Sequence, residues 1–123
     1  MAVRVALSEA ADLDLPGRRS RELVSGASGA NSTLRLVEIA VPEPEATPRP
    51  PHYHPDSEEC IHVLSGKGVT RVDDQDFQMN PGDTIRIAPG ERHVTRNTGS
   101  KPLVMLCFFP APSFEMLMDD ADG

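Results

Sequence analysis

Three histidines and a glutamate in this chain have the spacing of a metal-binding site. His52 and His54 are separated by one residue, and side chains alternate along an extended chain, so both imidazoles project from the same side. A carboxylate follows at Glu58 or Glu59, and His93 in a later polar segment offers a fourth donor. Three neutral imidazoles and one carboxylate suit Fe, Mn, Ni, Cu, Co or Zn, and they leave positions of an octahedral metal open. The pattern therefore predicts a metal centre that can also bind water, dioxygen or a bidentate substrate.

The position of the carboxylate ligand has two candidates, Glu58 and Glu59. Glu59 alternates in phase with Ile61 and Val63, which puts it on the apolar face of the expected strand. We therefore prefer Glu59 as the ligand and expect Glu58 to face solvent. His62 lies three residues after Glu59, so we expect it to face away from the metal and not to be a ligand.

Two further sets of polar residues each have two interpretations. Asn97 lies four residues after His93, and it either orients a metal ligand or bound water or caps the turn at Thr98-Gly99. Arg19 and Arg21 alternate on an expected strand and could hold a substrate carboxylate by paired hydrogen bonds. For these arginines a solvated sheet edge is the preferred interpretation.

The elements that must position these groups are short β-strands. Nowhere do apolar residues recur at helical spacing over three turns, whereas short alternating runs bounded by turn residues recur along the chain. The expected strands cover residues 19–25, 33–41, 61–64, 68–72, 76–79, 84–87, 91–97 and 103–109. The apolar phase changes between Leu36 and Val37, which predicts either a bulge or a strand covered on both faces. The segment 42–51 contains five prolines and is expected to be an ordered loop that delivers His52.

A chain of 123 residues is expected to form a single domain. We divide it into an N-terminal arm with edge strands at residues 1–32, a barrel at 33–112 and a tail at 113–123, which is a lid, a docking segment or a frayed end. The run Leu103–Phe109 is apolar at every position, so its second face is expected to meet another layer or a partner subunit. Candidates for an apolar wall around the metal, or for ordinary core, are Phe77, Met79, Met105, Cys107 and Phe109.

The net charge and the cysteine content limit which partners and which cellular compartment are expected. A formal net charge of −7 and a pI near 4.9 argue against nucleic acid, because phosphate binding relies on clustered Lys and Arg. The N-terminus lacks the apolar core of a signal peptide, and no stretch approaches the length of a membrane span. Cys60 and Cys107 are expected to be buried free thiols of a reducing compartment. We therefore expect a cytoplasmic protein that binds neither nucleic acid nor membranes.

Two stretches around the predicted donors resemble the paired motifs of the cupin family. The first motif (G, five residues, H-x-H, three or four residues, E, six residues, G) is matched by His52, His54, Glu59 and Gly66, with Ala46 at the leading glycine. The second motif (G, five residues, P-x-G, two residues, H, three residues, N) is matched by Gly82, Gly90, His93 and Asn97, with Ala88 at the proline. The resemblance covers roughly residues 33–109, and the gap before Gly66 also selects Glu59.

The resemblance implies an all-β jelly-roll barrel, the double-stranded β-helix of cupins, with one divalent metal in its mouth. Fe or Mn is favoured, with Ni, Zn, Co or Cu as alternatives, and a homodimer is expected because cupins commonly pair sheets across subunits. The function expected first is a metalloenzyme that acts on a small oxygen-rich or carboxylated molecule, most like a dioxygenase. The alternatives are a non-redox isomerase, lyase or decarboxylase, which needs a separate proton shuttle, and a small-ligand or metal-binding module without turnover.

Overall fold

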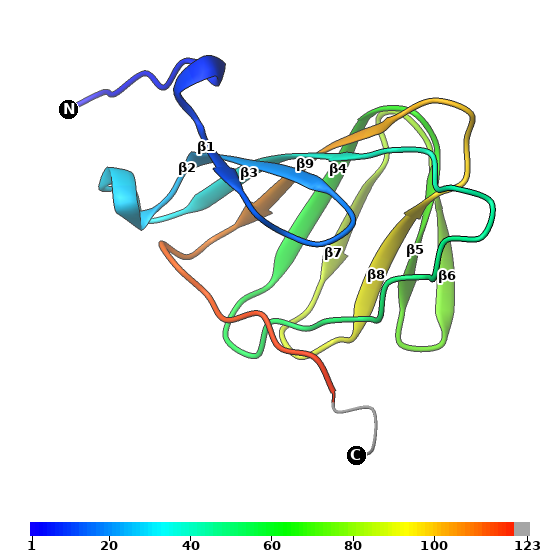
Figure 1. Cartoon of the computed structure of the whole chain (residues 1–123). Coiled ribbons are helices and arrows are strands. Elements are labelled where there is room, and N and C mark those ends of the chain that lie inside the picture. Colours follow the sequence, from blue (N-terminus) through cyan, green and yellow to red (C-terminus); the bar gives the residue numbers. More distant parts are fainter. Residues whose placement is uncertain (120–123) are drawn as a thin grey trace.

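Two antiparallel β-sheets face each other in the computed structural model of the chain, which describes residues 1–119 (Figure 1). The strands are β1 (Ala11–Leu13), β2 (Arg19–Val24), β3 (Thr33–Ile39), β4 (Glu59–Ser65), β5 (Gly68–Val72), β6 (Gln75–Met79), β7 (Thr84–Ile87), β8 (His93–Asn97) and β9 (Leu103–Phe109). The larger sheet has the order β1-β2-β3-β9-β4-β7, and the smaller sheet has the order β6-β5-β8. Two short 3-10 turns, η1 (Leu7–Glu9) and η2 (Gly26–Ser28), precede β1 and β3. This arrangement confirms the predicted all-β jelly-roll fold.

The space between the sheets is filled by alternate side chains of the strands. On β4 the buried residues are Glu59, Ile61 and Val63, and on β9 every second residue from Leu103 to Phe109 is buried. The apolar core consists of Val37, Ile39, Ile61, Val63, Val72, Met79, Ile87, Leu103, Met105, Cys107 and Phe109. Because Glu59 is the first residue of β4, its carboxylate lies at one end of this core.

Of the two interpretations of the apolar phase change at Leu36-Val37, a bulge or a strand covered on both faces, the bulge is absent from β3. Its pairing with β9 runs without a break from Thr33 to Ile39, so the apolar phase change reflects half-buried leucines on the outer face. The register shift of this region instead lies on β2, between Glu22 and Val24. Before β1 the chain forms an arm, in which Val3 is exposed.

The tail is docked against the barrel over residues 113–119 (Figure 1). Leu117 and Tyr53 form an antiparallel bridge with two main-chain hydrogen bonds of 2.9 Å, and Phe114 stacks on Phe109 with ring centroids 3.7 Å apart. Of the three interpretations of this segment, the structure supports docking. The part of the predicted tail at 120–123 lies outside the described residues.

No helix within residues 1–119 has the length and apolar character needed to cross a membrane.

Candidate metal centre

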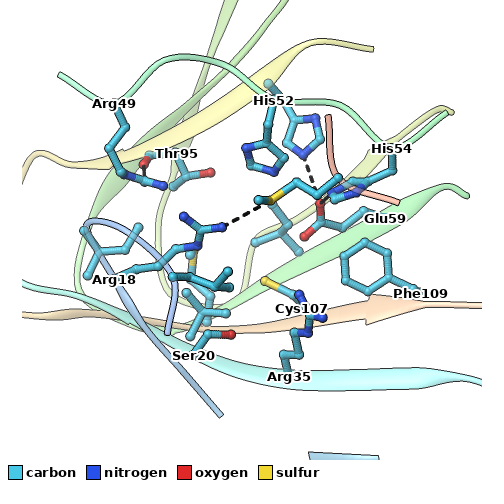
Figure 2. A pocket seen from close by; sticks show the side chains of 17 residues that line it. Arg18, Ser20, Arg35, Arg49, His52, His54, Glu59, Thr95, Cys107 and Phe109 are labelled. Carbon is cyan, nitrogen blue, oxygen red and sulfur yellow. Dashed lines mark hydrogen bonds and ion pairs between the residues drawn. The ribbon is translucent and has the colours of Figure 1, made fainter. Parts of the chain in front are cut away.

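The four predicted donors come from three different parts of the fold. Glu59 begins β4 in the larger sheet, and His93 begins β8 in the smaller sheet. His52 extends the smaller sheet, because it exchanges two main-chain hydrogen bonds of 3.0 and 2.8 Å with His93. His54 follows in the same loop, where its carbonyl accepts a hydrogen bond of 2.9 Å from the Gly90 N–H. The loop and both sheets thus converge on one point (Figure 2).

The distances among the donor atoms match those of a mononuclear metal site. One ligand atom of each of the four residues lies within 4.8 Å of all the others. Oε1 of Glu59 is 3.0 Å from Nε2 of His93 and 3.3 Å from Nε2 of His54. Two ligands at right angles, each about 2.1 Å from a metal, are about 3 Å apart. The cluster is therefore close to the geometry that metal binding requires.

The hydrogen bonds of the two buried imidazoles test whether a metal fits. Nδ1 of His54 lies 2.8 Å from the Glu115 carbonyl, and Nδ1 of His93 lies 2.9 Å from the Glu91 carbonyl. A carbonyl only accepts, so each Nδ1 carries its proton and donates it. In the neutral rings both Nε2 lone pairs then face the Glu59 carboxylate, and His54 Nε2 is buried without a hydrogen-bond partner in the described part of the chain. A cation between these atoms satisfies all of them, so the donor set fits a divalent transition metal.

The electrostatics favour the metal-binding protonation states of Glu59 and His52. Burial lowers the pKa of His93, but its contacts, above all the hydrogen bond to Glu59, outweigh burial and raise that pKa. Burial raises the pKa of Glu59, but its contacts with His54 and His93 outweigh burial and lower that pKa to about 2. Burial, followed by the neighbouring His93, lowers the pKa of His52 to about 3. At neutral pH the carboxylate is therefore ionised and the His52 imidazole is neutral.

The neighbouring acidic and imidazole groups lie outside the cluster, as the strand alternation predicts. Glu58 forms a surface ion pair with Arg86. His62 is on the outer face of β4, with Nδ1 2.8 Å from the Thr84 hydroxyl.

Asn97 is placed differently from the expectation that it orients a ligand or a bound water. Its amide nitrogen donates to the carbonyls of Ile39 (3.0 Å) and Lys101 (2.8 Å), and its amide oxygen accepts from the Gly99 N–H (2.8 Å). These bonds hold the turn between β8 and β9 together. The structure therefore assigns Asn97 the alternative role of a turn cap.

Arg19 and Arg21 do not face the site, in agreement with the preferred interpretation of a solvated sheet edge. Arg19 and Arg21 flank the buried Ser20 and therefore project to the outer side of β2, where Arg19 pairs with Asp12. The cavity beside the cluster is lined instead by Arg18, Arg35 and Arg49. Alternation along the strands could have identified two of these arginines. Arg18 is in phase with Ser20 and Arg35 is in phase with Val37, so both project to the inner face.

This cavity has a volume of about 50 Å³, and the four donors lie on its wall. Three members of the expected apolar wall, Met105, Cys107 and Phe109, line it, whereas Met79 belongs to the core and Phe77 packs against that core. Both thiols are free; Cys107 is buried, but Cys60 is only half-buried, which corrects the expectation that both are buried.

A jelly roll with three imidazoles and one carboxylate at the end of its core is the architecture of a metal-binding cupin. The chain belongs to this family: the Cupin_2 family, described as the cupin domain, matches residues 38–109.

Similar proteins include both uncharacterized chains and enzymes. An uncharacterized protein of Methanocaldococcus jannaschii is 37% identical over 81 residues, which are 65% of this chain and 63% of that protein. The glucose-6-phosphate isomerase of Thermococcus litoralis is 34% identical over 67 residues, covering 49% of this chain and 35% of the isomerase. A solved structure that concerns the Mn(II) centres of Bacillus subtilis oxalate decarboxylase aligns with a TM-score of 0.74 and 22% identity, covering 91% of this chain and 30% of that one. This chain thus spans less than two thirds of the length of each of these relatives.

Proposed function

We propose that the protein is a metal-dependent enzyme that acts on a small carboxylated molecule by dioxygenase-like chemistry. The observation that carries the proposal is a four-donor cluster, with three donors buried and His52 half-buried, that opens onto a cavity lined by three arginines. Four protein ligands leave coordination positions for a substrate and for oxygen. The guanidinium groups supply the charge that attracts a carboxylate into the same cavity.

Iron or manganese is the metal we favour, with nickel, zinc, cobalt and copper as alternatives. Imidazole and carboxylate donors accept all of these metals, and the Mn(II) centres of the structurally similar oxalate decarboxylase support manganese. When bound, such a metal supplies a Lewis acid and, for iron or manganese, a site for oxygen. The chain's own contribution is to bind the substrate through arginine and to exclude water with Met105, Phe109 and Met116.

A non-redox isomerase or decarboxylase is the second candidate. It is favoured by two of the similar proteins, a glucose-6-phosphate isomerase and an oxalate decarboxylase. Such chemistry needs a proton shuttle next to the substrate. Apart from the four donors, the ionisable groups that line the cavity in the described part of the chain are three arginines and Cys107. Burial raises the pKa of Cys107 well above its usual value, so this group stays a protonated thiol at neutral pH and is not available to accept a proton, and oxygen chemistry remains our first choice.

The test begins with metal content, measured by mass spectrometry on protein purified without an affinity-metal step. We expect near-stoichiometric iron or manganese in the wild type, and loss of that metal in His52→Ala and His93→Ala. His62→Ala, which removes an imidazole from the outer face of β4, is the matched control and should keep the metal. A folded wild type that refuses every added divalent metal contradicts the proposal.

The reaction class is then decided by oxygen uptake with small enols, diols, hydroxy acids and keto acids. Oxygen consumption that depends on both metal and substrate supports the dioxygenase-like reaction. If a substrate is converted at the same rate when oxygen is absent, the protein is a non-redox enzyme. If the protein binds metal and ligands but converts none of the compounds, it is a binding module without turnover.

A further inference from the structure

Arg18 and Arg49 bring two positive charges into the cavity without acidic partners. The ion pairs within residues 1–119 include neither of them, whereas Arg35, the third arginine of the cavity wall, pairs with Glu22 at 3.5 Å. Arg18 donates to the Pro16 carbonyl (3.0 Å) and to the Met116 sulfur (3.6 Å). The described hydrogen bond of the Arg49 guanidinium is to the Thr95 carbonyl. Each guanidinium has five N–H donors, so most of them remain available to a ligand.

Burial makes these two charges costly unless an anion joins them. Both side chains are partly buried, and burial lowers the pKa of each, with the Arg18 charge lowering the pKa of Arg49 further, to about 10. Glu59 is the single carboxylate on the cavity wall, and it faces His54 and His93. A partly buried cation is normally paired. Within residues 1–119 the more distant charge of Glu59 acts favourably on Arg18, but no carboxylate forms an ion pair with either arginine, so an anionic ligand can supply the partner.

The backbone holds the two arginines next to each other. The turn Pro16-Gly17 precedes Arg18, and Gly17 has a φ of +74°, which favours glycine. A Cβ at this position would collide with Cδ of Arg49, so the Arg49 side chain packs directly against the glycine next to Arg18. Figure 2 shows Arg18 and Arg49 on one side of the cavity, with His54 and Glu59 on the other.

We infer that Arg18 and Arg49 form a subsite for a second anionic group, so that the site selects a small molecule with two anionic groups. This inference rests on the proposed function, in which one end of the substrate meets the metal. The distal group is a carboxylate or a phosphate, because a guanidinium fork binds both. A cavity of about 50 Å³ restricts the remainder of the ligand to a few atoms. Arg49 lies within residues 38–109, which match the cupin domain, whereas Arg18 lies before them, so one half of the subsite comes from the chain's N-terminal segment.

The test compares ligands that differ in the second anionic group. Malonate is titrated against propionate, and phosphoglycolate against glycolate, by calorimetry on metal-loaded and metal-free protein. We expect the dianion to bind roughly 10- to 100-fold more tightly than its monoanion, as hydrogen bonds to charged groups imply. Arg18→Gln and Arg49→Gln should each remove most of that preference while metal content stays at the wild-type value. A preference for malonate or for phosphoglycolate identifies the group as carboxylate or phosphate.

Two further variants make the result specific to this pair of arginines. Arg19→Gln removes an equal charge from the neighbouring residue on the outer face and should keep the full preference. Gly17→Ala keeps both charges but displaces Arg49, and it should lower the preference as well. Equal affinity for dianions and monoanions in the wild type, or a preference that survives both arginine substitutions, overturns the inference. Metal content is measured on the same samples, so failure of metal binding counts against the proposed function. In the metal-free titrations the arginines alone should bind malonate or phosphoglycolate, and Arg18→Gln and Arg49→Gln should each lower that affinity, which decides the role of the arginines separately.

Discussion

Main-chain carbonyls orient two of the imidazoles in the candidate metal centre. Glu115 presents its carbonyl to Nδ1 of His54, and Glu91 presents its carbonyl to Nδ1 of His93. A hydrogen bond at Nδ1 fixes the tautomer and leaves Nε2 free to bind a metal. The orientation of these ligands therefore depends on the path of the backbone on either side of the site, and one of the two carbonyls belongs to the tail.

A substitution of Asn97 can distinguish a structural role of this side chain from a role in metal binding. We expect Asn97→Ala to lower the free energy of unfolding by about 1–3 kcal/mol, because the carbonyl of Ile39 loses a buried donor and the turn loses two further hydrogen bonds. Chemical denaturation measures this change. The metal content of the folded variant should equal that of the wild type. A folded Asn97→Ala protein that has lost its metal would show that the amide supports the ligands after all.

The sequence predicts the donors of the site better than it predicts the wall of the cavity. Alternation places His52 and His54 on one side of the chain and Glu59 on the apolar face of its strand, and the spacing that resembles the cupin motif joins the two. Arg18 and Arg49 meet only because a turn at Gly17 packs against a side chain far along the chain. Such a contact is tertiary, and it leaves no periodic signal in the sequence.

The tail is the element whose role was least predictable. Its segment 114–118 is a single apolar turn in the sequence, but in the fold it contributes a main-chain bridge to Tyr53, a stacked ring on Phe109 and the acceptor for His54. Two of these partners, Tyr53 and His54, are distant from the tail in sequence. The barrel strands, by contrast, are local patterns bounded by turn residues, and the structure places them near the expected positions.

Removing the tail should weaken metal binding without unfolding the barrel. A chain that ends at Pro112 loses the acceptor for His54 Nδ1 and the ring of Phe114 that packs on that imidazole. We expect metal affinity, measured by competition with a chelator, to fall by about 10- to 100-fold, the usual effect of losing a partner of a metal-ligating histidine. A chain that ends at Asp119 keeps the tail contacts described above and serves as the control. Equal affinities in the two truncated chains would contradict this role of the tail.

The outer face of the larger sheet bears on the assembly of the whole molecule. On β9 the outward residues are Val104, Leu106 and Phe108, and Phe108 is 39% exposed. Leu106 pairs with Leu36 of β3, so apolar groups extend across neighbouring strands. We propose that a second copy of the chain covers this face. Sedimentation velocity at micromolar concentration should show a homodimer, and Phe108→Glu should shift it to the monomer because a buried unpaired charge is costly. A wild-type monomer under these conditions would remove the proposal.

The metal centre joins the two sheets at one end of the molecule, so metal should stabilise the whole fold. Glu59 belongs to the larger sheet and His93 to the smaller, and a metal held by both crosslinks β4 to β8. A ligand at a hundred times its Kd stabilises the folded state by about 2.7 kcal/mol, which for a domain of this size raises Tm by roughly 10 °C. We expect calorimetry to show that Tm falls by this amount after treatment with a chelator. Addition of iron or manganese should restore the original Tm. In His93→Ala the crosslink is broken, so Tm should be the same with and without chelator. A wild-type Tm that does not respond to chelator or metal would mean that the two sheets hold together without an ion between them.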